Sequence, residues 1–165
     1  MALQQTVRLR MMFGIDIELL MAWRSNKLVY DGFYTQKQPL VWAEHIDTQI
    51  RRNPCSWRQW IIEYVTDDYT VRPVGWLGIS CLDNWYPDIG ILIGETTLWG
   101  KGIGKQALNL ALDWLRDNKY QKARASVKED NTRSQKLFES VGFHKVGEAR
   151  IGELAYEVDL RAKAA

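Results

Sequence analysis

The chain alternates apolar and polar residues with two different periods, and the change from one period to the other marks the expected elements. "TVRLRMM" (residues 6–12) has the period of two of a half-buried strand. "GIDIELLMAWRSN" (residues 14–26) follows with helical spacing and ends in polar residues. Residues 40–52 also have helical spacing, which stops at Asn53-Pro54 because the residue before a proline disfavours helical dihedral angles. The first third of the chain therefore predicts one strand and two helices.

The first predicted helix should pack against the protein through an apolar stripe. Ile15, Leu19, Ala22 and Trp23 fall on one side of it at helical spacing. Residues 27–39, which come next, show no regular period and contain several aromatic side chains. Because loops often carry binding residues, we expect an irregular aromatic loop of functional importance there.

The pattern after residue 55 is typical of a sheet with helical crossovers. Two β-type runs joined by a polar turn predict a hairpin, and a third short strand follows it. A glycine-rich loop then leads into a long helix, a strand, a shorter helix and two final strands. The predicted strands are residues 56–65, 72–83, 88–94, 122–127, 144–150 and 152–160, and the shorter helix covers residues 132–143. This order predicts an α+β fold class.

Composition limits the classes of protein and of partner. A chain of 165 residues, of which 46% are hydrophobic, has the size and apolar content of a single domain, which we expect to span residues 1–165. A formal net charge of +2 is too small for the electrostatic footprint of a duplex-binding protein, so no nucleic acid is expected as a partner. The sequence shows neither a run of about 20 apolar residues nor the apolar stretch of a secretory signal. We therefore expect a cytoplasmic protein without membrane attachment.

The cysteines and histidines predict no special chemistry. Cys55 and Cys81 form no C-x-x-C pair, and the chain has two histidines, so neither a disulfide framework nor a metal site is expected. We interpret both cysteines as structural. The sequence leaves the oligomeric state open, and a homodimer is one option.

Three glycines stand at alternate positions from residue 100 to residue 104, directly before the long predicted helix. This helix should begin near Gly102 or Gly104, because its apolar face starts at Ile103. The free N–H groups and the positive dipole end of a helix N-terminus bind anions, and glycines let phosphate oxygens reach the backbone. The glycine spacing fits neither the Walker loop of nucleoside triphosphatases nor the G-x-G-x-x-G order of dinucleotide-binding folds. The loop therefore predicts a phosphate site of another kind.

Two blocks of sequence resemble the acyl-CoA core of the GNAT N-acetyltransferase superfamily. "WGKGIGKQAL" (residues 99–108) is similar to the family pattern Gln/Arg-x-x-Gly-x-Gly/Ala, except that Trp99 stands at its first position. "NTRSQKLFESVGF" (residues 131–143) is similar to the second block, Asn-x-x-Ala-x-x-x-Tyr followed by Gly-Phe, with Phe138 at the tyrosine position. The resemblance covers residues 76–150 and is strongest to the branch of ribosomal-protein N-terminal, aminoglycoside and amino-sugar acetyltransferases.

The resemblance implies an acyl-CoA N-acyltransferase fold, with a mixed central sheet of about six or seven strands flanked by about four helices. It also implies an enzyme that moves the acetyl group of acetyl-CoA to a primary amine of a small molecule or of a protein N-terminus, by direct attack on the thioester. The alternatives are an aminoglycoside or nucleotide-amino-sugar acetyltransferase and, from another class, a non-catalytic acyl-CoA sensor. The implied cofactor-binding residues are Leu92, Ile93, Trp99, Gly100, Lys101, Gly102, Ile103, Gly104, Lys105, Asn131 and Phe138.

Asn131 has two interpretations. By the resemblance it contacts the pantetheine arm of the cofactor. However, Thr132 to Gln135 fits an S/T-x-x-E/Q capping box, so Asn131 alternatively only precedes a capped helix.

By the resemblance, the general base is a carboxylate on the strand before the glycine loop, where Asp88 stands. Period-two alternation places Ile89, Ile91 and Ile93 on one face of this strand, and Asp88 and Gly90 on the other. Asp88 would then point to a face where a glycine permits close approach. The alternative bases are Glu95, Glu129 and Asp130.

Phe138 is a departure from the family pattern that bears on catalysis. Many relatives carry a tyrosine at this position, whose hydroxyl protonates the departing CoA thiolate, and phenylalanine has no proton to give. Tyr156 or Ser134 could substitute, or the thiolate could leave through water. The same departure is the best sequence argument for the sensor.

The acceptor is expected to enter from the first half of the chain. The predicted substrate-binding residues are Tyr30, Phe33 and Tyr34 of the aromatic loop. His45 on the next helix is an alternative base, although we interpret it as a surface residue.

Overall fold

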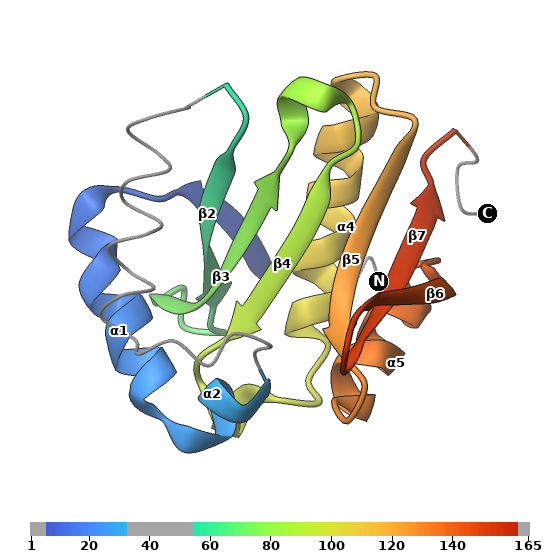
Figure 1. Cartoon of the computed structure of the whole chain (residues 1–165). Helices are drawn as coiled ribbons and strands as arrows, with labels where there is room; N and C mark the ends of the chain where they lie inside the picture. Colours follow the sequence, from blue (N-terminus) through green and yellow to red (C-terminus); the bar gives the residue numbers. More distant parts are fainter. Residues whose placement is uncertain (1–5, 33–54, 162–165) are drawn as a thin grey trace.

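The computed structural model describes residues 6–32 and 55–161, and the strands of this part form one seven-stranded sheet (Figure 1). The strands are β1 Val7–Met11, β2 Arg58–Val65, β3 Val71–Ser80, β4 Asp88–Ile93, β5 Lys122–Lys128, β6 His144–Arg150 and β7 Glu153–Asp159. Their order is β1-β2-β3-β4-β5-β7-β6, and of these neighbours β4 and β5 run parallel while the others run antiparallel. The predicted α+β class with a mixed sheet is confirmed.

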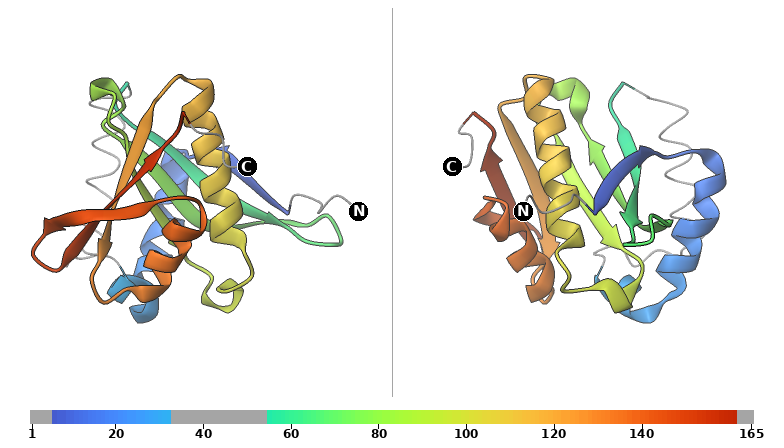
Figure 2. Two further views of the ribbon diagram at one scale, coloured as in Figure 1. Left: turned by 90° about the vertical axis from the view of Figure 1, so that its right-hand side faces the viewer. Right: turned by 180° about the vertical axis from the view of Figure 1, so that it is seen from behind.

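Helices cover both faces of this sheet. The described ones are α1 Ile17–Ser25, α2 Lys27–Gly32, α4 Ile103–Asp117 and α5 Thr132–Ser140, with short 3₁₀ turns η1 Gly14–Asp16, η2 Leu82–Asn84 and η3 Thr96–Leu98. The view from behind in Figure 2 shows α4 lying across the strands. Helices α4 and α5 pack into one apolar cluster, and α1 and α2 pack into a second cluster on the other face. None of the described helices combines the length and the apolar content that crossing a bilayer takes.

Helix α4 forms because its apolar positions recur at helical spacing and lie against the sheet. Its buried side chains are Ile103, Ala107, Leu108, Ala111, Leu112 and Leu115. The prediction of an apolar face that starts at Ile103 is therefore confirmed. Trp114 is half-buried and packs edge-on against Trp60, with 5.4 Å between the ring centroids. Each fully buried leucine contributes about 1.5–3 kcal/mol to folding, so this face fixes α4 firmly behind β4 and β5.

The predicted stripe of the first helix is wrong in part. Ile15 is 78% exposed and Ala22 is exposed, whereas α1 buries Leu20 and Trp23. The reason is that Ile15 belongs to η1, whose 3₁₀ geometry has three residues per turn and shifts the face that meets the sheet.

The prediction of an irregular loop is also wrong for residues 27–32, because they form helix α2. Asn26 begins this helix. Its Oδ1 accepts a hydrogen bond from the Leu28 N–H at 3.0 Å, and its carbonyl accepts one from the Tyr30 N–H at 2.9 Å. An asparagine before a helical segment is a common N-terminal cap, so this signal was present in the sequence.

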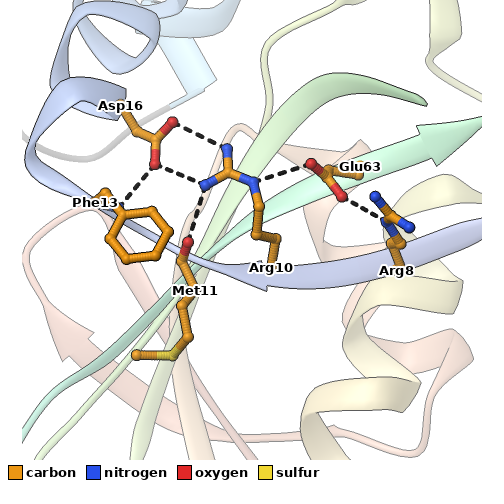
Figure 3. Close-up of polar contacts among 6 residues, drawn as sticks. All are labelled: Arg8, Arg10, Met11, Phe13, Asp16 and Glu63. Carbon is orange, nitrogen blue, oxygen red and sulfur yellow. Dashed lines mark hydrogen bonds and ion pairs between the residues drawn. The ribbon is translucent and has the colours of Figure 1, made fainter. Parts of the chain in front are cut away.

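A cluster of ion pairs fastens η1, and with it α1, to the edge of the sheet (Figure 3). The two Nη atoms of Arg10 on β1 each lie 3.0 Å from an oxygen of Asp16, and its Nε lies 2.9 Å from Glu63 on β2. Arg8 contacts the same Glu63 at 2.6 Å, and the Phe13 N–H donates to Asp16 at 2.8 Å. Both carboxylates are buried, and such two-pronged arginine contacts fix orientation as well as adding energy. The cluster therefore sets where α1 and α2 lie.

Candidate functional site

Strands β4 and β5 separate toward their C-terminal ends. They pair at Asp88 and Arg124, near the start of both strands. Figure 1 shows the two arrows diverging toward their heads. The Arg124 N–H donates a hydrogen bond to the Pro87 carbonyl at 2.9 Å, also near the start of the two strands. Beyond Asp88 no described strand pairs with β4 on this side, so the edge of β4 faces an opening.

The loop between β4 and α4 has a backbone that glycine adopts without strain. Gly100 and Gly102 have φ of 80° and 81°, in the left-handed region, and open space where a Cβ would stand. Gly102 is the N-cap of α4, as predicted, and no side chain caps the helix there. The first-turn N–H groups of α4 are therefore available to an anion. Gly104 allows α4 and α5 to pack closely, because a Cβ at this position would lie 3.0 Å from the Leu137 side chain of α5.

A cavity of about 310 Å³ lies between this loop, the end of β4, α2 and α5. The implied cofactor residues that line it are Leu92, Ile93, Trp99, Gly100, Gly102, Ile103, Gly104 and Lys105. Lys101 is exposed and is not among its described lining residues. The described lining contains three cations, Lys105, Arg133 and Lys136, and no carboxylate. This excess of positive charge beside a helix N-terminus favours an anionic ligand.

A second, smaller cavity of about 40 Å³ continues between β4, β5 and α5. Gly32, Ile91 and Ser134 line both cavities, so the two adjoin. The remaining described residues around the smaller one are Ile89, Gly90, Ser126, Val127, Lys128 and Phe138. We call the two cavities together the β4 channel. It runs from the glycine loop along β4 to the place where β4 and β5 meet.

Asn131 lies beside the channel and has both ends of its amide engaged. Its Oδ1 accepts from the Ser134 N–H, and its Nδ2 donates to the Gly32 carbonyl, each at 3.1 Å. Asn131 is thus the N-cap of α5, whereas the capping-box pattern placed that role on Thr132, which is inside the helix. The side chain ties α5 to the end of α2, and Asn131 is not among the described residues that line the channel.

The expected acceptor residues are only partly within the described chain. Tyr30 lies on α2 and is not among the described lining residues, whereas its neighbours Val29 and Gly32 do line the channel. Phe33, Tyr34 and His45 lie outside the described residues.

Asp88 stands at the start of β4, on the face that it shares with Gly90. Its Oδ2 lies 3.2 Å from the Arg124 Nε, and its side chain is half-buried. Burial raises the pKa of the Asp88 carboxyl above its ordinary value, although the charge of Arg124 acts in the opposite direction. Glu95, an alternative base, lies at the other end of β4 as the N-cap of η3.

The carboxylates near Asp88 are compensated by cations of the protein itself. Lys122 lies 3.0 Å from Glu157, and the Tyr86 hydroxyl donates a hydrogen bond to the same carboxylate. The Arg124 guanidinium lies 4.4 Å from the centroid of the Tyr86 ring, between this pair and Asp88. Arg150 and Glu153 also act on the Asp88 carboxyl, with opposite signs, so the described charges around Asp88 balance.

The two hydroxyls proposed to replace the family tyrosine lie in different places. Tyr156 is 2% exposed within the core cluster of α4 and α5, and its hydroxyl donates to Glu139 at 3.2 Å. Ser134 lies where the two cavities adjoin, one helical turn before Phe138, which is 3% exposed. Within the described residues the Ser134 hydroxyl has no hydrogen-bond partner. Ser134 is therefore the hydroxyl that the channel can use.

Arg133 is a channel residue that the sequence motifs did not identify. Its Cζ lies 3.2 Å from the centroid of the Trp99 ring, so the guanidinium of α5 covers the indole of the glycine loop. The Trp99 Nε1 donates to the Ile93 carbonyl at 2.9 Å, which holds the indole at the end of β4. The available signal was a basic residue inside the second family block, at a position that the family pattern leaves variable.

Residues 7–144 match the family described as "Acetyltransferase (GNAT) domain". A protein of Methanocaldococcus jannaschii described as uncharacterized is 49% identical over 146 residues. These residues are 88% of this chain and 29% of the relative, so the chain spans less than a third of that protein's length.

Solved structures are similar over nearly the whole chain. The crystal structure of a domain from Methanocaldococcus jannaschii has a TM-score of 0.84 at 46% identity, and the match covers 93% of this chain and 97% of that one. Spermidine N-acetyltransferase from Vibrio cholerae, in complex with CoA and spermine, has a TM-score of 0.76 at 17% identity, with 96% and 98% covered. The aminoglycoside acetyltransferase AAC(6')-Ib, in complex with coenzyme A, has a TM-score of 0.74 at 17% identity, with 92% of each chain covered. At such low identity the last two matches concern the fold.

Proposed function

The chain belongs to the GNAT acetyltransferase family, and from that premise we propose that it is an N-acetyltransferase that moves the acetyl group of acetyl-CoA to a primary amine. The β4 channel carries this proposal, because it joins a glycine loop with free helix N–H groups to an open strand edge, and its inner end lies at Ile89, next to the half-buried carboxylate of Asp88. Two structures of similar fold were determined with coenzyme A bound, which supports the same ligand.

The residues of the channel fit acetyl-CoA. The N–H groups from Gly100 to Lys105 suit a diphosphate, and the open edge of β4 at Leu92 and Ile93 suits the amides of a pantetheine arm. Phe138 closes the inner end with an apolar wall. When bound, acetyl-CoA supplies a thioester carbonyl that an amine can attack.

Asp88 is proposed to take the proton of the amine. At pH 7, deprotonating a lysine-like amine costs about 4.6 kcal/mol and deprotonating an α-amine costs about 1 kcal/mol, so a base matters most for the former. A carboxyl whose pKa burial has raised is a better match to this task than an exposed one. Gly90 lies on the same face, and the Trp76 ring packs over it, 3.4 Å from where a Cβ would stand.

We propose that the Ser134 hydroxyl donates a hydrogen bond to the departing sulfur. In this role the hydroxyl would keep its own proton. The C–S bond would break as the amine nitrogen forms the new N–C bond, the amine proton would go to Asp88, and the departing thiolate would take a proton from water. Phe138 then serves only as a wall, and the Ser134 donor is what an enzyme has and a sensor that binds the cofactor without turnover does not need.

The charges around Asp88 favour an acceptor with a single amine. Asp88 and Glu157 are each paired with a cation of the protein, so the described surface offers little unbalanced negative charge to a polyamine or an aminoglycoside. A small molecule with one primary amine, such as an amino sugar carried on a nucleotide, or a protein N-terminus agrees better with this balance.

The test is release of free thiol from acetyl-CoA with a panel of amines. The panel contains a short peptide with a free N-terminus, a nucleotide-linked amino sugar, spermidine and an aminoglycoside. We expect turnover with at least one monoamine and little with the two polycations. Tight CoA binding without turnover of any amine would replace the enzyme by the sensor, and preferred turnover of a polycation would overturn the charge argument alone.

A further inference from the structure

Arg133 and Trp99 form a stack at the wide end of the β4 channel, between two separate elements. Trp99 follows η3 and is held by its hydrogen bond to the Ile93 carbonyl, and its ring also packs against the cluster around α1. Arg133 comes from the first turn of α5, and its Cζ lies 3.2 Å from the centroid of that ring. The Arg133 guanidinium is therefore held in place by Trp99 before any ligand binds.

Stacking uses the face of the guanidinium and leaves its donors free. The five N–H groups lie in the plane of the group and point outward from the edge of the ring below. No described carboxylate pairs with Arg133. Partial burial lowers the pKa of its guanidinium, whose ordinary value lies far above neutral pH, so the group is charged at pH 7. A planar fork of donors without an anion suits a phosphate, which accepts two parallel hydrogen bonds from arginine.

The positive charge around this end exceeds what a diphosphate requires. The described lining carries Lys105, Arg133 and Lys136, and the N–H groups of the glycine loop add further donors. These amides and Lys105 belong to the α4 side of the cavity. Arg133 and Lys136 belong to the α5 side, where a second phosphate group would find its own cations.

Resting on the proposed function, we propose that Arg133, held by Trp99, binds the 3′-phosphate of coenzyme A and makes the protein prefer the 3′-phosphorylated cofactor. The diphosphate is then bound by the glycine loop, and the two phosphate sites are independent. Trp99 acts as a positioning residue, because it fixes the orientation of the fork and touches no phosphate itself.

Calorimetric titration with coenzyme A and with 3′-dephospho-coenzyme A tests this assignment, using the full chain and the variants Arg133→Gln, Arg133→Lys and Arg58→Gln. Arg58 is exposed at the start of β2 and is not among the described channel residues, so its variant controls for the loss of one positive charge. We expect the unmodified protein to bind coenzyme A roughly tenfold more tightly than the dephosphorylated form, as one charged hydrogen-bonding contact allows. Arg133→Gln should abolish this ratio and leave the affinity for the dephosphorylated form unchanged. Arg58→Gln should leave the ratio intact.

Arg133→Lys separates the planar fork from the charge. Lysine keeps the charge but loses the two-pronged contact and the ring stacking, so the ratio should fall to an intermediate value. If Arg133→Gln weakens both ligands by the same factor, Arg133 serves the diphosphate and the assignment is wrong. If it weakens neither, the stack is only packing, and the assignment is also wrong. Failure of the unmodified protein to bind either ligand would instead overturn the proposed function.

Discussion

The two ends of β4 have different chemistry. At its C-terminal end the described lining of the cavity has bare backbone N–H groups and cations but no carboxylate, whereas at its N-terminal end Asp88 is paired with Arg124 and Glu157 with Lys122. The first end is uncompensated and so attracts an anion from solution. The second end is balanced and so does not attract polycations, and burial, against the effect of Arg124, raises the pKa of the Asp88 carboxyl there.

This difference teaches that one strand can separate binding from reaction. Affinity for the cofactor should depend on residues around the C-terminal end of β4, and the rate of transfer on residues around its N-terminal end and at the inner cavity. Substitutions at either end, and one at the junction of the two cavities, can break or sharpen this separation.

The largest effect is expected from Asp88→Asn, which keeps the shape of the side chain and removes the base. Turnover at saturating acetyl-CoA should fall about 100-fold or more, because positioned acid–base catalysis contributes at least that factor. Coenzyme A affinity by calorimetry should stay within about twofold of the original value, given the distance of six strand residues from the glycine loop. Asp83→Asn on the exposed η2 turn is the matched control and should leave both quantities unchanged. Unchanged turnover of Asp88→Asn would remove Asp88 from the mechanism.

A smaller effect at the opposite end is expected from Gly102→Ala. The residue has φ of 81°, and a methyl group would stand where an anion approaches the N-terminus of α4, so coenzyme A affinity should fall roughly tenfold. Gly152→Ala is the control, because Gly152 has φ of 80° and equally open surroundings in the turn between β6 and β7. The two variants should lose similar stability in urea melts. Equal loss of affinity in both would mean that backbone strain, and not the anion site, causes the effect.

The smallest effect is expected at the junction of the cavities. Ser134→Ala should lower turnover about fivefold with little change in coenzyme A affinity, as the loss of one hydrogen-bond donor predicts. Adding Phe138→Tyr should restore turnover, because a tyrosine hydroxyl then lies one helical turn away on the same wall. Ser140→Ala at the exposed end of α5 is the control. A double variant no faster than Ser134→Ala would argue against a donor at this place.

The elements with a strong local period could be predicted from the sequence. The start of α4 at Gly102 and the strands β6 and β7 follow from patterns within a few residues, and so does the glycine loop. The error at Ile15 has a local cause too, since a 3₁₀ turn and an α-helix differ by a fraction of a residue per turn.

The candidate site could be predicted only as far as neighbouring residues define it. Asp88 is a prediction from one strand of the sequence, whereas its partner Arg124 comes from β5 and meets it only through the parallel pairing. Likewise Asn131 reaches Gly32 across the molecule, and Arg133 reaches Trp99 across the channel mouth. Such contacts depend on the fold as a whole, and no spacing within one segment encodes them.

The ion pairs of Arg10 have a consequence for behaviour in acid. Burial acts to raise the pKa of the Asp16 carboxyl, but the hydrogen bonds from Arg10 and from the Phe13 N–H outweigh it and hold that pKa below its ordinary value. The stability that this carboxylate provides is complete above about pH 4 and is lost as the pH falls through its lowered pKa. Acidification should therefore loosen η1 and α1, and with them the α2 wall at Val29, while α4 remains folded. Amide hydrogen exchange followed from pH 5 downward should show protection disappearing first from α1 and only later from α4, and the reverse order would contradict this.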